Sequence, residues 1–400
     1  MNLTSNKENK QKYFGKKIFL IYLALVGTFA PISTDIYLPS LGKMVTYFNQ
    51  PISTVNLTLS MFFVFYSIGI LLWGPLSDKF GRKKILLTGL VSYTLASLVC
   101  IFSENIWQLI GGRIFQALGG AASVAVVSAI IKDVYLAKER ETALATVQSI
   151  AVLAPMVAPL LGAAILNFFP EWQVVFIVLA AAGLIATIST LFFTETHGGN
   201  SEFTIASALW DIKVALSKFK LAALLLIFSL PLIPFLSYIV SASYIYMMFF
   251  NLSATQFSLF FAANAAITIV SPIIYIKVLR KYFQIRNLVA ACFATMIISG
   301  LCMYFWGSNN EWLFLATIIP NTLAGSVLRP PGANIMLGKH ENAGTTSSLM
   351  GFSAMFLGGV GTLLVSLGWT NIISFLGILF AIVGCVALIM WLCLYERVID

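Results

Sequence analysis

The sequence predicts an all-α integral membrane protein, with twelve transmembrane helices in two six-helix bundles around a central cavity. Three observations support this: the composition, the number of long apolar segments, and the placement of the basic residues. The chain of 400 residues is 59% hydrophobic and only 10% charged, with a mean hydropathy of +0.92. Soluble domains are roughly a quarter charged. Lipid must therefore cover most of this surface, which excludes a disordered, fibrous or soluble nucleic-acid-binding protein.

Twelve apolar segments are long enough to cross a bilayer, which takes about 20 residues. The first six lie at 18–40, 54–74, 85–103, 106–131, 143–168 and 173–194. The other six lie at 221–249, 256–279, 287–306, 312–338, 345–367 and 371–394. The predicted organisation is a tail (1–17), a bundle (18–194), a polar linker (195–220), a second bundle (221–394) and a tail (395–400).

The basic residues predict the orientation, because Lys and Arg collect in the cytoplasmic loops of membrane proteins. With the N-terminus inside, all but three of the 24 basic residues fall in the tails or in loops on that side. The exceptions are Lys43, Arg113 and Arg329. We therefore expect a multi-pass protein of the cytoplasmic (inner) membrane with both termini in the cytoplasm. The net charge of +9 follows from membrane insertion, so no nucleic-acid partner is expected.

Asp35 is the only acidic residue well inside a predicted span, where an ionisable group is costly and usually functional. A carboxyl group between apolar surroundings and a cation can hold either a proton or a cationic ligand. Arg113 is expected at a comparable depth in a neighbouring span and cannot lose its charge. We expect the two to interact, directly or through water. The alternatives are that Asp35 caps a helix break near Pro39 and that Arg113 only holds helices together.

Other spans carry further candidates for a substrate cavity. Arg329 precedes two prolines and either lines the cavity or packs near the inner end of its span. Pro155 and Pro159 share a helix face, and with Gly162 they predict a kinked helix that packs closely against a neighbour. The remaining candidate cavity-lining residues are Gln148, Tyr238, Tyr244 and Tyr246.

The cytoplasmic loop from Gly74 to Lys84 carries the sharpest motif. Gly74 is expected to permit close helix contact, and Gly81 to permit a tight turn. Asp78 is placed to cap the following turn or to pair with a cation. Basic residues, among them Arg82, anchor the next span on the cytoplasmic side.

These motifs resemble those of the major facilitator superfamily. The loop Gly74 to Lys84 is similar to its signature between the second and third spans, and Arg113-Ile114-Phe115-Gln116 to its fourth-span Arg-x-x-Gln pattern. Residues 154–162 resemble the fifth-span motif of exporters. The string Ser33 to Pro39, with Arg329-Pro330, is similar to the bicyclomycin/chloramphenicol-resistance branch of twelve-span drug:proton antiporters.

The resemblance implies a secondary active transporter that exports a small, drug-like amphipathic compound in exchange for protons by alternating access. It implies that Asp35 is the protonation site, that Arg113 is its partner in proton coupling, and that both contact substrate. The proton gradient supplies the coupling ion, so no metal or other cofactor is expected, and a monomer is the default. The residues expected to take part in gating are Gly74, Asp78, Gly81, Arg82, Lys132, Asp133, Pro155, Pro159 and Gly162.

Several alternatives stay open at this stage. Export of an endogenous metabolite or siderophore fits the same pattern, as does proton-coupled import by the same fold, and a passive channel is a further rival. A membrane-embedded enzyme is not expected, because a catalytic site needs a second carboxylate or a histidine. His197 and His340 both lie in predicted cytoplasmic loops, and no second carboxylate lies well inside a span.

Overall fold

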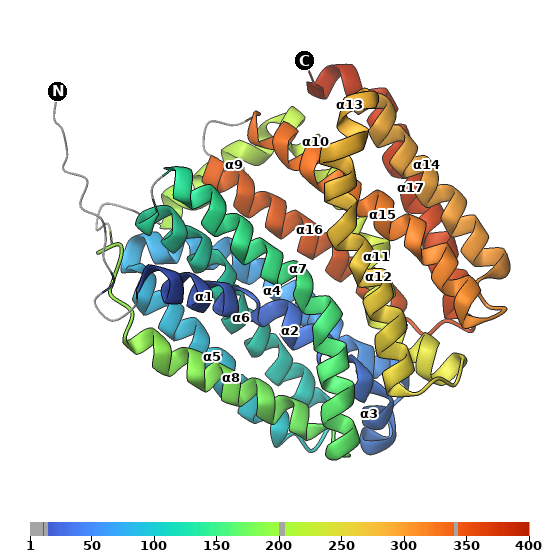
Figure 1. Cartoon of the computed structure of the whole chain (residues 1–400), viewed down its shortest axis with the longest axis horizontal. Coiled ribbons are helices and arrows are strands. Elements are labelled where there is room, and N and C mark those ends of the chain that lie inside the picture. Colours follow the sequence, from blue (N-terminus) through green and yellow to red (C-terminus); the bar gives the residue numbers. More distant parts are fainter. Residues whose placement is uncertain (1–10, 12–14, 136, 200–204, 340–342, 400) are drawn as a thin grey trace.

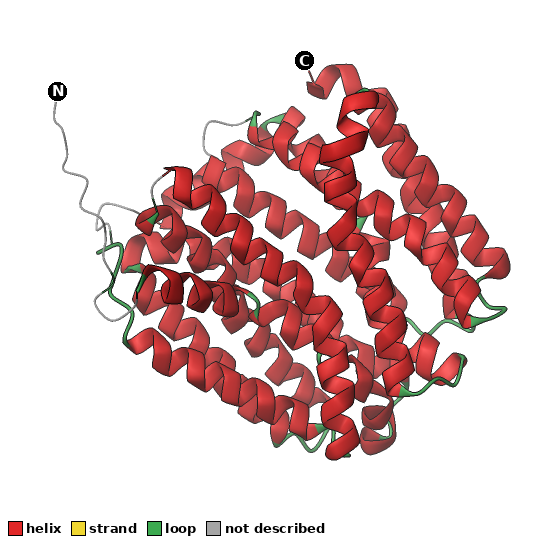
Figure 2. Ribbon diagram, viewed as in Figure 1, coloured by secondary structure: helices red, strands yellow, loops and turns green. Residues whose placement is uncertain are grey.

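The structure of the chain is a computed structural model that describes residues 11, 15–135, 137–199, 205–339 and 343–399. These residues form helices joined by short loops, and no strand occurs among them (Figure 2). The predicted all-α membrane class is confirmed. In the described ranges, ten helices are long and apolar enough to span a membrane, and one bent pair makes an eleventh. A shorter apolar helix, Leu153–Phe168, stands where the fifth predicted span was expected.

The first predicted span is broken into short pieces, because prolines lack the amide hydrogen that continues a helix. The two halves of this bent span meet at an angle of 42°. The pieces are α1 (Lys16–Gly27), α2 (Phe29–Asp35), a 3-10 turn η1 (Leu38–Ser40) and α3 (Leu41–Phe48). The other helices of the first half are α4 (Ile52–Phe80), α5 (Arg82–Ile101), α6 (Ile106–Val134), α7 (Ala137–Phe168) and α8 (Gln173–Leu191).

The polar stretch 195–220 contains a helix, α9 (Ile205–Ser217), that the sequence analysis did not predict. Two elements of the second half are π-helical turns, η2 (Tyr244–Phe249) and η3 (Tyr275–Leu279). The α-helices of the second half are α10 (Phe219–Ser229), α11 (Leu232–Ser243), α12 (Ala254–Ile274), α13 (Arg280–Tyr282), α14 (Ile285–Trp306), α15 (Glu311–Leu337), α16 (Ala343–Val365) and α17 (Ile372–Ile399).

The two halves lie side by side, with α7 and α12 adjacent along their boundary (Figure 1). The packing of α4 on α16 and of α7 on α12 joins the halves. Two polar contacts accompany these helix pairs. The hydroxyl oxygens of Ser60 and Ser366 are 3.2 Å apart, and the Ser258 hydroxyl donates to the Pro159 carbonyl oxygen at 3.0 Å. The broken first span contributes too, because η1 contacts α11 and α12.

Three glycines of the predicted motifs behave differently in the structure. A Cβ atom on Gly162 would lie 2.9 Å from the Ile36 carbonyl carbon and closer still to its oxygen, so α7 reaches the end of α2 because this residue is glycine. Gly81 has φ +97°, the left-handed region that the expected tight turn requires. The expectation for Gly74 is wrong: no described atom lies within 4 Å of a Cβ placed there.

Candidate functional site

A cavity of about 280 Å³ lies between the two halves. Its walls come from α2, α4 and α7 of the first half and from α11, α12, α15 and α16 of the second. Small-molecule sites typically measure about 300–1,000 Å³, so this one is small. Its aromatic lining residues are Phe62, Phe63, Tyr66, Phe235, Tyr238 and Phe261. Its polar lining residues are Thr34, Asp35, Asn264, Thr268 and Arg329.

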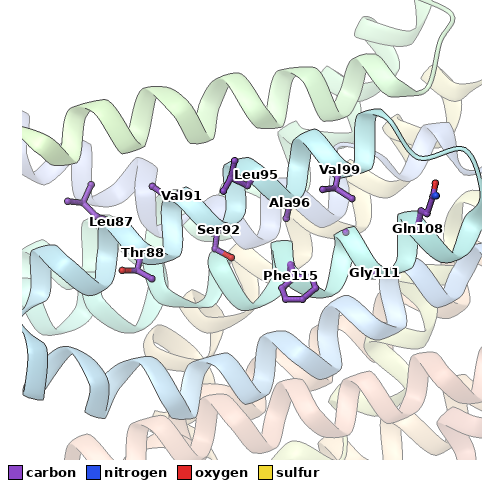
Figure 3. A pocket seen from close by; sticks show the side chains of 11 residues that line it. Leu87, Thr88, Val91, Ser92, Leu95, Ala96, Val99, Gln108, Gly111 and Phe115 are labelled. Carbon is purple, nitrogen blue, oxygen red and sulfur yellow. The ribbon is translucent and has the colours of Figure 1, made fainter.

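A larger hollow, of about 870 Å³, lies against α5 and α6 of the first half (Figure 3). Its lining residues Val91, Leu95 and Phe115 are exposed, and none of the residues that line it is charged. Exposed apolar side chains on a membrane-spanning helix contact lipid tails. This hollow therefore belongs to the lipid-facing surface, and the central cavity is the candidate site.

Asp35 lines the central cavity at the last residue of α2. The break in the first span ends the helix here, and the side chain is only 3% exposed. The Thr34 hydroxyl donates to Asp35 Oδ1 at 3.1 Å. No other hydrogen bond or ion pair to this carboxylate occurs among the described residues. Asp35 is also the only acidic residue among those that line the cavity.

Arg113 lies in α6 behind the cavity wall and is fully buried. Its Nη1 donates to the Ser33 carbonyl oxygen at 3.2 Å, while its Cζ lies 4.8 Å from the Tyr37 ring centroid and 4.3 Å from that of Phe62. Its Nε and Nη2 have no hydrogen-bond partner among the described atoms. No salt bridge joins Arg113 to Asp35 here. The connection between them runs through the α2 backbone at Ser33, two residues before Asp35.

A buried polar network surrounds this arginine. Arg113 Nη1 also donates to Gln116 Oε1, and Gln116 Nε2 donates to the Ser97 hydroxyl at 2.7 Å. The hydroxyls of Ser33 and Tyr93 share a short hydrogen bond. Because buried polar groups are costly unless they are bonded, this network fixes α2 against α5 and α6. The arginine and the glutamine of the Arg-x-x-Gln pattern are therefore hydrogen-bonded to each other in the structure.

Arg329 lines the cavity from α15 of the second half, so the first of its two predicted alternatives holds in this structure. Its side chain is exposed to this internal space, and its Cζ lies 5.5 Å from the Phe235 ring centroid. The guanidinium makes no hydrogen bond or ion pair with any residue that the structure describes. The cavity's free cation is thus Arg329, whereas Arg113 is enclosed by aromatic rings.

Of the other residues predicted to line the cavity, one does so and two do not. Tyr238 lines the cavity, but Tyr244 and Tyr246 are not among the residues that do, and Tyr246 packs 5.1 Å from the Phe260 ring instead. The side chain of Gln148 lies outside the described residues. Asn264 was missed: it lines the cavity from α12, and its Oδ1 has no hydrogen-bond partner in the described part of the chain. An amide inside an otherwise apolar predicted span was the signal that could have found it.

A charge cluster occupies the predicted cytoplasmic end of the first half. Arg82 is 6% exposed; its Nη1 lies 2.6 Å from Asp78 Oδ1 and its Nε lies 2.9 Å from Asp133 Oδ2. These contacts hold the α4–α5 loop against the end of α6. The side chain of Lys132 is exposed, and its carbonyl oxygen accepts a hydrogen bond from Arg140.

Glu195, which the sequence analysis assigned to the linker, completes this cluster. Its carboxylate accepts hydrogen bonds from the backbone amides of Arg82 and Lys83 at 3.0 Å each. These are the first residues of α5, where amide hydrogens have no partner within the helix. A carboxylate at a helix N-terminus is also favoured by the helix dipole. Glu195, in the chain after α8, thus caps the N-terminus of α5.

Comparison with known proteins agrees with these motifs. The family model of the Major Facilitator Superfamily matches residues 23–362. A bicyclomycin resistance protein homolog of Haemophilus influenzae is 26% identical over 372 residues, covering 88% of this chain and 89% of its own. A chloramphenicol resistance protein of Pseudomonas aeruginosa is 32% identical over 170 residues, covering 42% of this chain and 40% of its own.

Solved transporters share the fold at low sequence identity. The crystal structure of a D-xylose–proton symporter superposes with a TM-score of 0.69 and 16% identity, covering 93% of this chain and 96% of that one. A bacterial homolog of the human lysosomal transporter Spinster, in an inward-facing and occupied conformation, superposes with a TM-score of 0.73 and 14% identity. The match covers 95% of this chain and 97% of that one. By its family model and its helices, this chain belongs to the major facilitator superfamily and is a multi-pass membrane transporter, not an enzyme.

Proposed function

We propose that this transporter exports a small amphipathic, drug-like compound across the cytoplasmic membrane in exchange for protons, with both termini in the cytoplasm. The observation that carries the proposal is the place of Asp35. It is the one acidic side chain in the cavity between the halves, and only a threonine hydroxyl bonds it among the described residues. A carboxyl group with so few partners is free to exchange a proton or a substrate contact. The names of the resistance-protein relatives support the drug-like substrate.

The proposed cycle uses the two halves as rocking bundles. With the cavity open to the cytoplasm, substrate binds while Asp35 releases its proton inward. The halves then rock, and the cavity opens outward. Protonation of Asp35 from outside loosens α2 in the cavity wall, which releases the substrate and resets the transporter. The membrane potential contributes about 2.3 kcal/mol per charge per 100 mV to such a cycle.

Arg113 is proposed to sense the charge on Asp35 through α2. Two of its nitrogens lack hydrogen-bond partners among the described atoms, and the third donates to the Ser33 carbonyl oxygen. When Asp35 is ionised, it attracts this fixed cation and draws α2 toward α6. When Asp35 is protonated, the attraction falls and α2 is released. The rings of Tyr37 and Phe62, each beside the guanidinium, keep the cation in place in both states.

The proposed gates lie at the two ends of the cavity. On the predicted outer side, α7 is sealed by the contact of Gly162 with Ile36 and by the bond from Ser258 to Pro159. On the predicted cytoplasmic side, the charge cluster around Arg82 holds the α4–α5 loop. Opening on either side requires these contacts to be rearranged.

The test is efflux of chloramphenicol from proteoliposomes with an imposed pH gradient, in wild-type protein and in D35N. We expect wild-type efflux to depend on the gradient and D35N to lose that dependence while inserting and folding normally. D211N is the matched control, because Asp211 is an exposed residue of α9, and it should transport as the wild type does. Gradient-driven efflux by D35N at the wild-type rate would refute Asp35 as the protonation site. Accumulation driven by the same gradient would instead indicate import.

A further inference from the structure

The central cavity contains two side chains of opposite charge, Asp35 and Arg329, that do not pair with each other. They face it from different halves, α2 and α15. Asp35 has the Thr34 hydroxyl as a partner, whereas Arg329 has only the Phe235 ring, 5.5 Å from its Cζ, and no hydrogen bond or ion pair among the described residues. An uncompensated cation at this depth in a membrane protein is costly. The arrangement therefore indicates that a partner for Arg329 arrives from outside the protein.

The second half supplies no acidic counter-ion for Arg329 in the part that the structure describes. Glu311 begins α15, 18 residues before Arg329 along the helix, which corresponds to about 27 Å. Glu396 lies in the last turn of α17. Neutral polar residues, among them Asn321 and Thr322, line a hollow of about 10 Å³ together with Arg329.

A second side chain with an unbonded polar atom lines the same cavity. Asn264 is 3% exposed, lines the cavity from α12, and leaves its Oδ1 without a hydrogen-bond partner among the residues that the structure describes. Such a group inside a protein is costly unless a ligand or water bonds it. The wall of the second half thus offers a guanidinium with five N–H donors and an amide with both a donor and an acceptor. Aromatic rings, including those of Phe62 and Phe261, line the space between the walls.

We propose that Arg329 binds an anionic group of the substrate, and that aromatic carboxylates or related aromatic oxyanions are among the transported compounds. A carboxylate matches the planar, bidentate fork of a guanidinium, and an aromatic body matches the rings of the walls. An anion compensates Arg329 whether Asp35 is protonated or not. A purely cationic compound compensates only ionised Asp35 and leaves Arg329 unpaired. This inference rests on the proposed function only in taking the central cavity as the substrate site.

The experiment measures binding of three matched probes to the purified full-length protein in lipid nanodiscs, without a proton gradient. The probes are 1-naphthylacetate, its neutral amide 1-naphthylacetamide, and the cation 1-naphthylmethylammonium. We expect the wild type to bind the carboxylate at least about tenfold more tightly than the amide, or about 1.4 kcal/mol. R329Q should reduce this ratio to near one by weakening carboxylate binding alone. R329K, which keeps the charge but not the fork, should keep part of the preference.

R286Q is the matched control, because Arg286 is exposed, lies 5.2 Å from the Tyr395 ring and is not among the residues that line the cavity. It should keep the wild-type ratio. Unfolding temperatures without ligand check that each variant is folded. The proposal is overturned if the wild type binds the amide or the cation as tightly as the carboxylate, if no probe binds, or if folded R329Q keeps the preference.

Failure of this inference can be told apart from failure of the proposed function. The charge preference is read at equilibrium, whereas proton exchange is read from gradient-dependent efflux in D35N. A retained preference with no gradient-dependent efflux would leave the substrate class standing and remove the antiport. Gradient-dependent efflux of chloramphenicol with no carboxylate preference would leave the antiport standing and remove the proposed substrate class.

Discussion

Replacement of Gly162 by alanine tests whether the close approach of α7 to α2 sets the geometry of the cavity wall. The new Cβ would lie 2.9 Å from the Ile36 carbonyl carbon, and nearer to its oxygen. Ordinary van der Waals contact begins near 3.4 Å, so the carbon atoms alone require α7 to move by about half an ångström and the oxygen requires more. The obstacle is backbone, which cannot rotate away as a flexible side chain can.

The magnitude follows from two opposing effects. Overpacking typically costs about 1–3 kcal/mol. Removing a glycine from a helix interior returns about 0.5–1 kcal/mol. The net destabilisation of this conformation is therefore about 1–2 kcal/mol, which lowers its population roughly tenfold relative to conformations in which α7 and α2 are apart. Because α7 also packs on α12, the displacement reaches the boundary between the halves.

The assay is the unfolding temperature in detergent together with the rate of probe efflux. We expect G162A to unfold a few degrees below the wild type and to transport more slowly. G111A is the matched control, since Gly111 also lies inside a spanning helix but a Cβ there meets no described neighbouring atom within 4 Å. It should be as stable as the wild type or more so. If G162A were as stable as G111A, the proposed packing of α7 would be refuted.

Two further predictions concern the charge cluster. R82A leaves the carboxylates of Asp78 and Asp133 without their cation and should destabilise the protein by about 2 kcal/mol. The measurement is the unfolding temperature, and the control is K84A, because Lys84 is an exposed neighbour. If R82A and K84A unfolded at equal temperatures, the two salt bridges of Arg82 would have no structural role. E195Q replaces charge-assisted hydrogen bonds to the start of α5 by neutral ones, at a cost of about 1 kcal/mol. Hydrogen exchange at the amides of Arg82 and Lys83 should then be faster, and unchanged exchange would contradict the capping role.

Much of the fold could be predicted because the deciding properties are local. A run of about 20 apolar residues is a span wherever it lies, and the twelve predicted segments correspond to the helices of the structure. The prolines flanking Asp35 interrupt their helix through a missing amide hydrogen. The helix at 205–217 escaped prediction because it lies in the polar segment between the bundles and is shorter than a span.

The candidate site, too, was predicted from the sequence only in part. Asp35 could be identified from the sequence, because a carboxyl group within a long apolar segment costs free energy in the membrane and is usually functional. The sequence also marked Arg113, as the expected partner of Asp35, and Arg329, as a second arginine within an apolar span. Only the packing of the halves decided that Arg329 faces the cavity and that Arg113 is enclosed behind its wall. The reason is physical: a membrane helix is apolar on nearly every face, so its sequence carries no amphipathic signal to tell the side that meets lipid from the side that meets the cavity.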